Sequence, residues 1–79
     1  MKLLARNLAR STTEQDIHAL FSAYGLVTAC DLVLDQITGQ SKGFAFVEMP
    51  DDQQAHAAIL GLHETRVAKS KIRVKIAQS

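Results

Sequence analysis

The chain has 79 residues, a formal net charge of +1 and one cysteine, so an internal disulfide bond is excluded and a single domain over residues 1–79 is expected. A domain of this size buries roughly 60 % of its unfolded surface and has only a modest core. The N-terminal segment carries charge within its first six residues, which excludes a signal peptide or membrane span there and predicts a cytoplasmic protein.

The charges are distributed unevenly along the chain. A net charge of +1 alone argues against a strong nucleic-acid binder. However, residues 1–10 and 65–79 carry eight of the nine lysines and arginines and no acid, whereas residues 11–64 carry all eight acids and one lysine, Lys42. If the two ends meet in the fold, the molecule has a basic side that attracts anionic partners and an acidic side that does not.

The first two predicted elements are a strand and a helix. A short apolar run between two cations predicts a strand over residues 2–6. Thr13, three residues before Asp16, resembles a capping box, and the apolar residues behind it predict a helix over residues 14–23. These apolar residues follow the i, i+3, i+4, i+7 spacing of one helical face and are Ile17, Leu20, Phe21 and Tyr24.

Two more strands are predicted in the middle of the chain. Residues 26–34 are rich in apolar and β-branched side chains and predict the second strand. A polar loop with one glycine follows. The third strand is predicted over residues 43–49 and ends before Pro50, which cannot continue a ladder of hydrogen bonds.

The octamer of residues 42–49 is the most informative segment of the chain. Side chains alternate between the faces of a strand, so three small or apolar side chains share one face: Ala45, Val47 and Met49. The other face carries Lys42, Phe44, Phe46 and Glu48. If the first face is the core, two aromatic rings lie in water beside a cation. Single-stranded nucleic acid suits such a face, because bases stack on aromatic rings and phosphates pair with lysine or arginine.

The last predicted elements are a helix over residues 52–61 and a strand over residues 71–76. Asp51 or Asp52 caps the helix, whose inner face is rich in alanine and can approach a sheet closely. The strand alternates strictly between basic and β-branched residues, as a half-buried strand does. By this alternation, the first and last strands place five cations on one face of the sheet: Lys2, Arg6, Lys71, Arg73 and Lys75.

The order of elements is therefore strand, helix, strand, strand, helix, strand. Two right-handed crossovers place the four strands in one antiparallel sheet with both helices on one face. We expect an α+β fold, a ferredoxin-like βαββαβ sandwich, in which the first and third strands are central and adjacent.

The chain resembles an RNA recognition motif domain over essentially its whole length. The octamer of this family is Lys or Arg, Gly, aromatic, Gly or Ala, aromatic, Val, any residue, aromatic. Residues 42–47 match this pattern, and Met49 replaces the last aromatic residue. Residues 3–8 resemble the family's shorter hexamer, with Leu4 at a position that is usually aromatic. Further similar segments are Leu20–Gly25, Thr38–Gly39 and Ala58–Ile59, and the resemblance is to the small stand-alone members found in bacteria.

This resemblance implies binding of single-stranded RNA and a role in post-transcriptional regulation. Because RNA and DNA can both stack and pair through phosphates, we expect only a modest preference for RNA over single-stranded DNA. The resemblance also implies that Phe46 stacks on one base, that Phe44 contacts a sugar or base, and that Lys42 pairs with a phosphate. Leu4 offers a flat contact without a π face, so binding should be about 10- to 100-fold weaker than in a relative with both aromatic residues. The predicted RNA-binding residues are Lys2, Leu4, Arg6, Lys42, Phe44, Phe46, Arg73 and Lys75.

Several other residues have more ordinary expected roles. Arg10 is predicted to be a solvated loop residue, and Cys30 is predicted to point into the core as a small hydrophobic side chain. Glu64 occupies a position where many relatives have a glycine, which predicts a different turn after the second helix. The three histidines follow no metal-ligand spacing and are expected to be exposed: His18, His56 and His63.

Two alternative interpretations also fit the sequence. If the octamer faces are inverted, Phe44 and Phe46 belong to the core. The sheet face or the helices could instead bind a protein partner, although members of the family that do so usually lose the octamer aromatics. The sequence contains no catalytic set and no metal-ligand spacing, so we expect no enzyme activity, no cofactor and no metal site, and a monomer that does not bind membranes.

Overall fold

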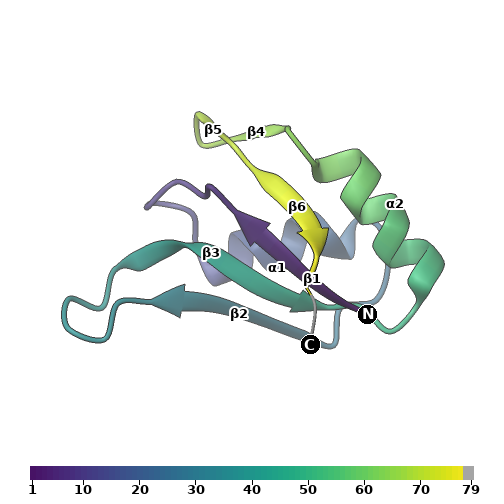
Figure 1. Ribbon diagram of the computed structural model, residues 1–79, viewed down its shortest axis with the longest axis horizontal. Coiled ribbons are helices and arrows are strands. Elements are labelled where there is room, and N and C mark those ends of the chain that lie inside the picture. Colours follow the sequence, from purple (N-terminus) through teal and green to yellow (C-terminus); the bar gives the residue numbers. More distant parts are fainter. Residues whose placement is uncertain (78–79) are drawn as a thin grey trace.

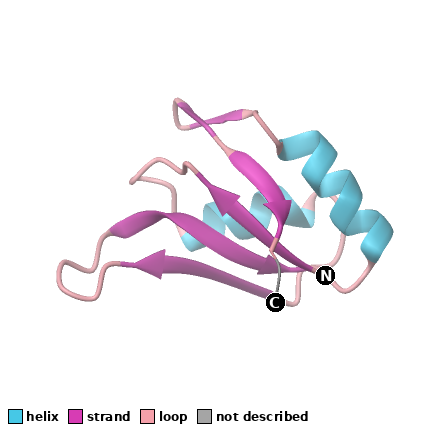
Figure 2. Cartoon of the chain, viewed as in Figure 1, coloured by secondary structure: helices cyan, strands magenta, loops and turns pink. Residues whose placement is uncertain are grey.

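The computed structural model describes residues 1–77 and has two layers, a sheet and two helices packed on one of its faces (Figure 1). The elements in chain order are β1 (Lys2–Arg6), α1 (Glu14–Ser22), β2 (Ala29–Leu34), β3 (Ser41–Glu48), α2 (Asp52–Leu62), β4 (Arg66–Val67), β5 (Ser70–Lys71) and β6 (Arg73–Ile76). The main sheet is antiparallel in the order β2-β3-β1-β6, so β1 and β3 are central and the predicted ferredoxin-like fold is confirmed (Figure 2).

Both helices begin with the type of cap that the sequence predicts. The Thr13 hydroxyl accepts a hydrogen bond from the Asp16 amide at 3.1 Å, and the Thr13 amide donates to the Asp16 carboxylate at 3.0 Å, which completes the capping box of α1. At α2 the cap is Asp51, whose carboxylate accepts from the Gln54 amide at 3.0 Å. These starting points direct the buried residues of the helices at the sheet: Ile17, Phe21, Ala55, Ala58 and Leu62.

The small and apolar face of the octamer is the core face. Ala45, Val47 and Met49 are each 0 % exposed, whereas Phe44 and Phe46 on the opposite face are half-buried. The inverted assignment is therefore wrong. Because both helices occupy the core side, the aromatic side of the sheet is its open side.

Gly43 is required by the path of β3. Its φ of 85° lies in the left-handed region, and a Cβ at this position would approach the Leu8 carbonyl oxygen to 3.3 Å. The Gly43 carbonyl accepts a hydrogen bond from the Leu8 amide at 2.9 Å. This hydrogen bond joins the start of β3 to the segment that follows β1. On the other side of β3, the β2–β3 register shifts between Leu32 and Leu34, as at a bulge.

Between α2 and β6 the chain forms a small hairpin, β4–β5, that the sequence analysis did not predict. Arg66 pairs with Lys71 in a separate two-stranded sheet, and the two turn residues Ala68 and Lys69 have φ values of 51° and 71°. Such tight turns usually contain Asn-Gly or Asp-Gly, so Ala-Lys carries little turn signal. Lys71 consequently lies in the hairpin and not on the main sheet, where strict alternation had placed it.

Three further positions differ from the expectation or refine it. The second strand begins at Ala29, three residues later than predicted, and before it the Leu26 amide donates to the Gln54 side chain of α2 at 3.0 Å and not to the sheet. Glu64 has a φ of 66°, a conformation that glycine adopts most easily. His63 is exposed, yet its Nδ1 accepts a hydrogen bond from the Val74 amide at 3.0 Å and so joins the end of α2 to β6.

Candidate nucleic-acid interface

The strand register arranges the predicted binding residues in rows across the open face. Arg6 of β1 lies in register with Phe44 of β3 and with Arg73 of β6. The next row contains Leu4, Phe46 and Lys75, and the row after it contains Lys2 and Glu48. Each row therefore joins a side chain of β1 to a side chain of β3.

The two phenylalanines form an edge-to-face pair. Their ring centroids are 6.1 Å apart and their planes are at 90°. The Nζ of Lys2 lies 5.0 Å from the centroid of the Phe46 ring, within the range of a cation–π interaction. Because the rings are perpendicular, they cannot both lie flat against one stack of bases, which is compatible with the predicted division between a base on Phe46 and a sugar or base on Phe44.

A hollow of about 490 Å³ opens beside these rings. Five of the eight predicted residues line it: Leu4, Arg6, Lys42, Phe44 and Phe46. Arg10 lines the same hollow, so it lies at the edge of the interface and not only in a solvated loop. Of the other predicted residues, Lys2 lies over the Phe46 ring, and the exposed Arg73 and Lys75 extend the face along β6.

Asn7 also lies at the candidate interface, although it was not among the predicted binding residues. It has a φ of 61°, and its side-chain amide donates to the Lys71 carbonyl at 2.7 Å. Asn7 lines the first hollow and, together with Arg6 and Arg73, a second hollow of about 390 Å³. The two hollows share Arg6 and Asn7 and are therefore adjacent. Asparagine tolerates the left-handed conformation, which is the signal that could have identified this position.

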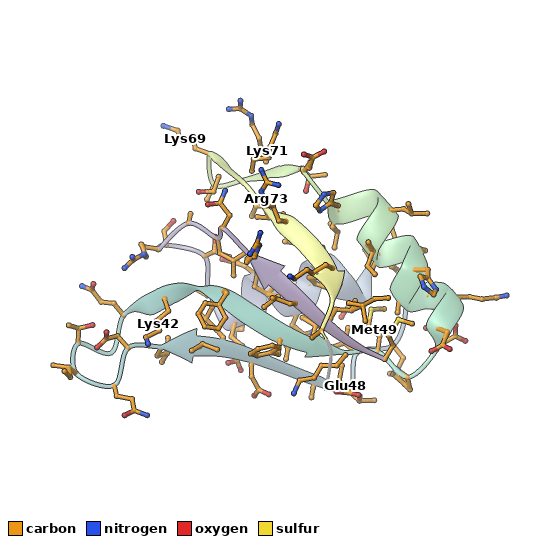
Figure 3. The ribbon with its side chains drawn as sticks, viewed as in Figure 1. Lys42, Glu48, Met49, Lys69, Lys71 and Arg73 are labelled. Atoms are coloured by element: carbon orange, nitrogen blue, oxygen red, sulfur yellow. The ribbon has the colours of Figure 1, made fainter. Side chains whose placement is uncertain are left out.

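The charge of the open face changes sign from one side to the other. The β6 side carries the exposed cations Arg73 and Lys75. On the β2 side, the exposed Asp31 lies in register with Phe46, and Glu48 lies near the end of β3. Figure 3 shows Arg73 on the β6 side and Glu48 on the β2 side. An anionic ligand is therefore attracted toward β1 and β6 and repelled from β2.

Three other features of the structure concern the Cys30 thiol, metal ligation and membrane-spanning helices. Cys30 is half-buried, and its burial, together with the charges of Glu14 and Asp31, raises the pKa of its thiol to about 11. The thiol is thus protonated at neutral pH and is a poor nucleophile. Within residues 1–77, no cluster of His, Cys, Asp or Glu could hold a metal ion, and no helix is long and apolar enough to cross a membrane.

The fold and this face define a class of protein: a small α+β domain that presents aromatic and basic side chains on the open side of an antiparallel sheet. The chain belongs to the RNA recognition motif family, whose model matches residues 3–73. The matched range includes the octamer on β3, the hexamer on β1 and both helices.

Named relatives cover nearly the whole chain. It is 40 % identical over 78 residues to the putative RNA-binding protein RbpD of Nostoc sp., covering 99 % of this chain and 83 % of that protein. It is 37 % identical over 78 residues to glycine-rich RNA-binding protein 1 of Mycosarcoma maydis, but this match spans only 45 % of that protein. A solved Sxl-lethal protein–RNA complex has a TM-score of 0.93 and 29 % identity, over 99 % of this chain and 47 % of that chain.

Proposed function

We propose that the chain binds single-stranded RNA through the open face of its main sheet and acts in post-transcriptional regulation as a binding protein, not as an enzyme. The observation that carries this proposal is the pair of rings, Phe44 and Phe46, on the open side of a central strand and bordered by cations. The similarity to RNA-binding relatives and to a protein solved with RNA supports it. We further propose that residues 1–79 act as one monomeric domain in the cytoplasm.

In the proposed complex, one base stacks on Phe46 and the neighbouring sugar or base contacts Phe44. Lys42 and Arg6, which line the same hollow, pair with phosphates, and Leu4 contacts a base without a π face. Arg73 and Lys75 attract the RNA phosphates toward β6, and Asp31 repels them from β2.

Lys2 has two roles in this mechanism. In the RNA-free domain its ammonium group lies over the Phe46 ring, an interaction of about 0.5–1 kcal/mol at an exposed site. A base that stacks on that side of the ring displaces the ammonium group, which is then free to pair with a phosphate. Lys2 therefore covers one side of the Phe46 ring in the RNA-free domain, and loss of this contact slightly reduces the free energy gained on binding.

We expect the domain to bind unpaired RNA of about two to four nucleotides and to leave duplex RNA unbound, because stacking requires bases that are splayed out of a helix. Fluorescence anisotropy with labelled single-stranded and duplex RNA of the same sequence, at several salt concentrations, tests this. Affinity for the single strand should fall steadily with salt, whereas an apolar protein partner would show little salt dependence. Tight duplex binding without measurable affinity for single strands would refute the proposal.

The double variant Arg73→Gln/Lys75→Gln separates charge from stacking. Both side chains are exposed on β6, so the fold should be retained. Each lost phosphate contact should lower the slope of log affinity against log salt by about 0.7, and the loss should be equal for all sequences. Titrations of two unrelated single strands measure both quantities. A variant that changed sequence preference and left the salt slope intact would contradict these roles.

A further inference from the structure

The β4–β5 hairpin is a basic projection at one side of the molecule. Its three cations, Arg66, Lys69 and Lys71, are all exposed, and one exposed acid, Glu64, lies at the base of the hairpin, where its amide donates to the Ile72 carbonyl at 2.8 Å. The hairpin therefore keeps a net positive charge. Figure 3 shows Lys69 and Lys71 pointing outward beyond the main sheet on the β6 side. None of the three belongs to the set of residues proposed above for the sheet face.

The tip of the hairpin is held in an unfavourable backbone conformation. Ala68 and Lys69 both have positive φ, where residues other than glycine, asparagine and aspartate are uncommon. Asn-Gly would form this turn more easily. A lysine at the outermost position therefore lowers the stability of the turn while adding an exposed cation. Stability alone does not account for this choice, whereas a ligand at the tip does.

The base of the hairpin is joined directly to the open face. Lys71 accepts, through its carbonyl group, the 2.7 Å hydrogen bond from the Asn7 side chain. Asn7 lines both the hollow beside the phenylalanine rings and the second hollow, which it shares with Arg6 and Arg73. A continuous series of hollows and cations thus leads from the rings of β3, past β1 and β6, to the hairpin.

The charges of the face give this path a direction. Asp31 and Glu48 border the face on the β2 side, so a phosphate backbone is repelled there. The exposed charged residues of β6 itself are the cations Arg73 and Lys75, and the hairpin extends this positive charge beyond the sheet. A strand longer than the few nucleotides that the face holds would therefore leave it on the hairpin side.

We propose that the β4–β5 hairpin is a second phosphate-binding site, which binds the sugar-phosphate backbone of a single strand where it leaves the sheet face. This inference rests on the proposed function. The contacts are made to phosphates alone, so the site adds affinity without sequence preference. Its ligand is the continuation of the strand already bound at the rings, and its contribution appears only with longer RNA.

The test compares random-sequence RNA pools of 4 and 12 nucleotides on the parent chain and on the variant Arg66→Gln/Lys69→Gln/Lys71→Gln. The variant should lose about 3- to 150-fold in affinity for the 12-mer, the range expected for three exposed ion pairs. Its salt slope for the 12-mer should fall by about 2, because each contact contributes about 0.7. Its affinity for the 4-mer should change by less than about twofold. Each comparison uses one RNA length, so the greater number of binding registers on the 12-mer cancels.

A matched control separates local contacts from net charge. The variant Gln53→Glu/His56→Glu/Ala57→Glu also lowers the net charge by three, from +1 to −2, but at exposed positions of α2. It should bind both RNA lengths within about twofold of the parent, because charges on the far side of the sheet are screened. An equal loss of 12-mer affinity in both variants would overturn the proposed site.

A second variant tests whether the triple variant loses affinity only because its hairpin unfolds. Ala68→Asn/Lys69→Gly gives the turn its preferred residues and removes one cation, so the fold should be retained or stabilised. The 12-mer salt slope should then fall by about 0.7, a third of the change in the triple variant. Unchanged 12-mer binding by both hairpin variants would overturn the proposal.

The two proposals fail in distinguishable ways. A parent chain that binds the 4-mer, together with hairpin variants that bind the 12-mer normally, refutes the hairpin site and leaves the sheet face intact. Loss of 12-mer binding in the hairpin variant, together with normal binding of both RNAs by Phe46→Ala, refutes the sheet face and, with it, the hairpin as the continuation of a strand bound there. A parent chain that binds neither RNA refutes both.

Discussion

Replacing Phe46 by alanine should weaken binding of short single-stranded RNA by about 1–3 kcal/mol, or about 5- to 150-fold. The Phe46 ring lies on the open face of a central strand, in register with Leu4, so it is the one π surface in its row. Its removal leaves a base with only the aliphatic side chain of Leu4 to contact. Isothermal titration with a random 4-mer pool, compared with the parent chain, measures the loss.

The fold should tolerate this change, because the ring is half-buried and its loss opens no enclosed cavity. The edge-to-face contact with Phe44 is lost, which costs about 0.5–1.5 kcal/mol of stability beyond the buried area. Phe46→Tyr retains a ring and should bind nearly as the parent does. Leu60→Ala, at a position that is 84 % exposed on α2, should leave affinity unchanged. Normal binding by a folded Phe46→Ala protein would show that the bases lie elsewhere.

The fold was predictable because local and long-range signals in this sequence agree. The Thr13–Asp16 capping box fixes the start of α1, and the alternation from Ala45 to Met49 identifies the core face of β3. Both patterns depend only on residues that are close in sequence, so they can be identified without a structure. The position of Phe44 and Phe46 on the open face follows from that alternation.

The edges of the candidate site were less predictable, because they depend on contacts between distant segments. Asp31 lies on the open face because it pairs with Phe46, and this pairing depends on the β2–β3 register. Asn7 and the hairpin depend on a hydrogen bond between residues 64 positions apart in the chain. No periodic pattern reports such contacts. The two-residue strands β4 and β5 are also too short to show alternation.

The charge asymmetry of the chain illustrates both cases. The concentration of cations in the two terminal segments is visible in the sequence, and the pairing of β1 with β6 brings those segments together as expected. Two acids, Asp31 and Glu48, also lie on the open face. Only Glu48 could be placed there from the sequence, because it belongs to the octamer, whereas Asp31 lies on β2. The resulting gradient across the sheet is what gives the proposed RNA path its direction.

Leu4→Phe should strengthen binding of short single-stranded RNA by about 10- to 100-fold, because it supplies the second aromatic surface that this chain lacks. Leu4 is half-buried, lies in register between Phe46 and Lys75, and lines the hollow of about 490 Å³ beside the rings. A phenylalanine ring at this position has open space above the sheet and a neighbouring ring beside it. Titration with the random 4-mer pool at fixed salt measures the gain.

This prediction concerns a gain, so loss of folding cannot imitate it. Leu60→Phe makes the same chemical change on the exposed side of α2 and should leave affinity unchanged, which controls for nonspecific adhesion of an added ring. Leu4→Ala should weaken binding, because it removes the flat apolar contact. The salt slope should be the same in all three variants, since none changes a charge. If Leu4→Phe remained folded and bound no more tightly than the parent, either Leu4 would not contact a base or the open sheet face would not be the RNA-binding surface.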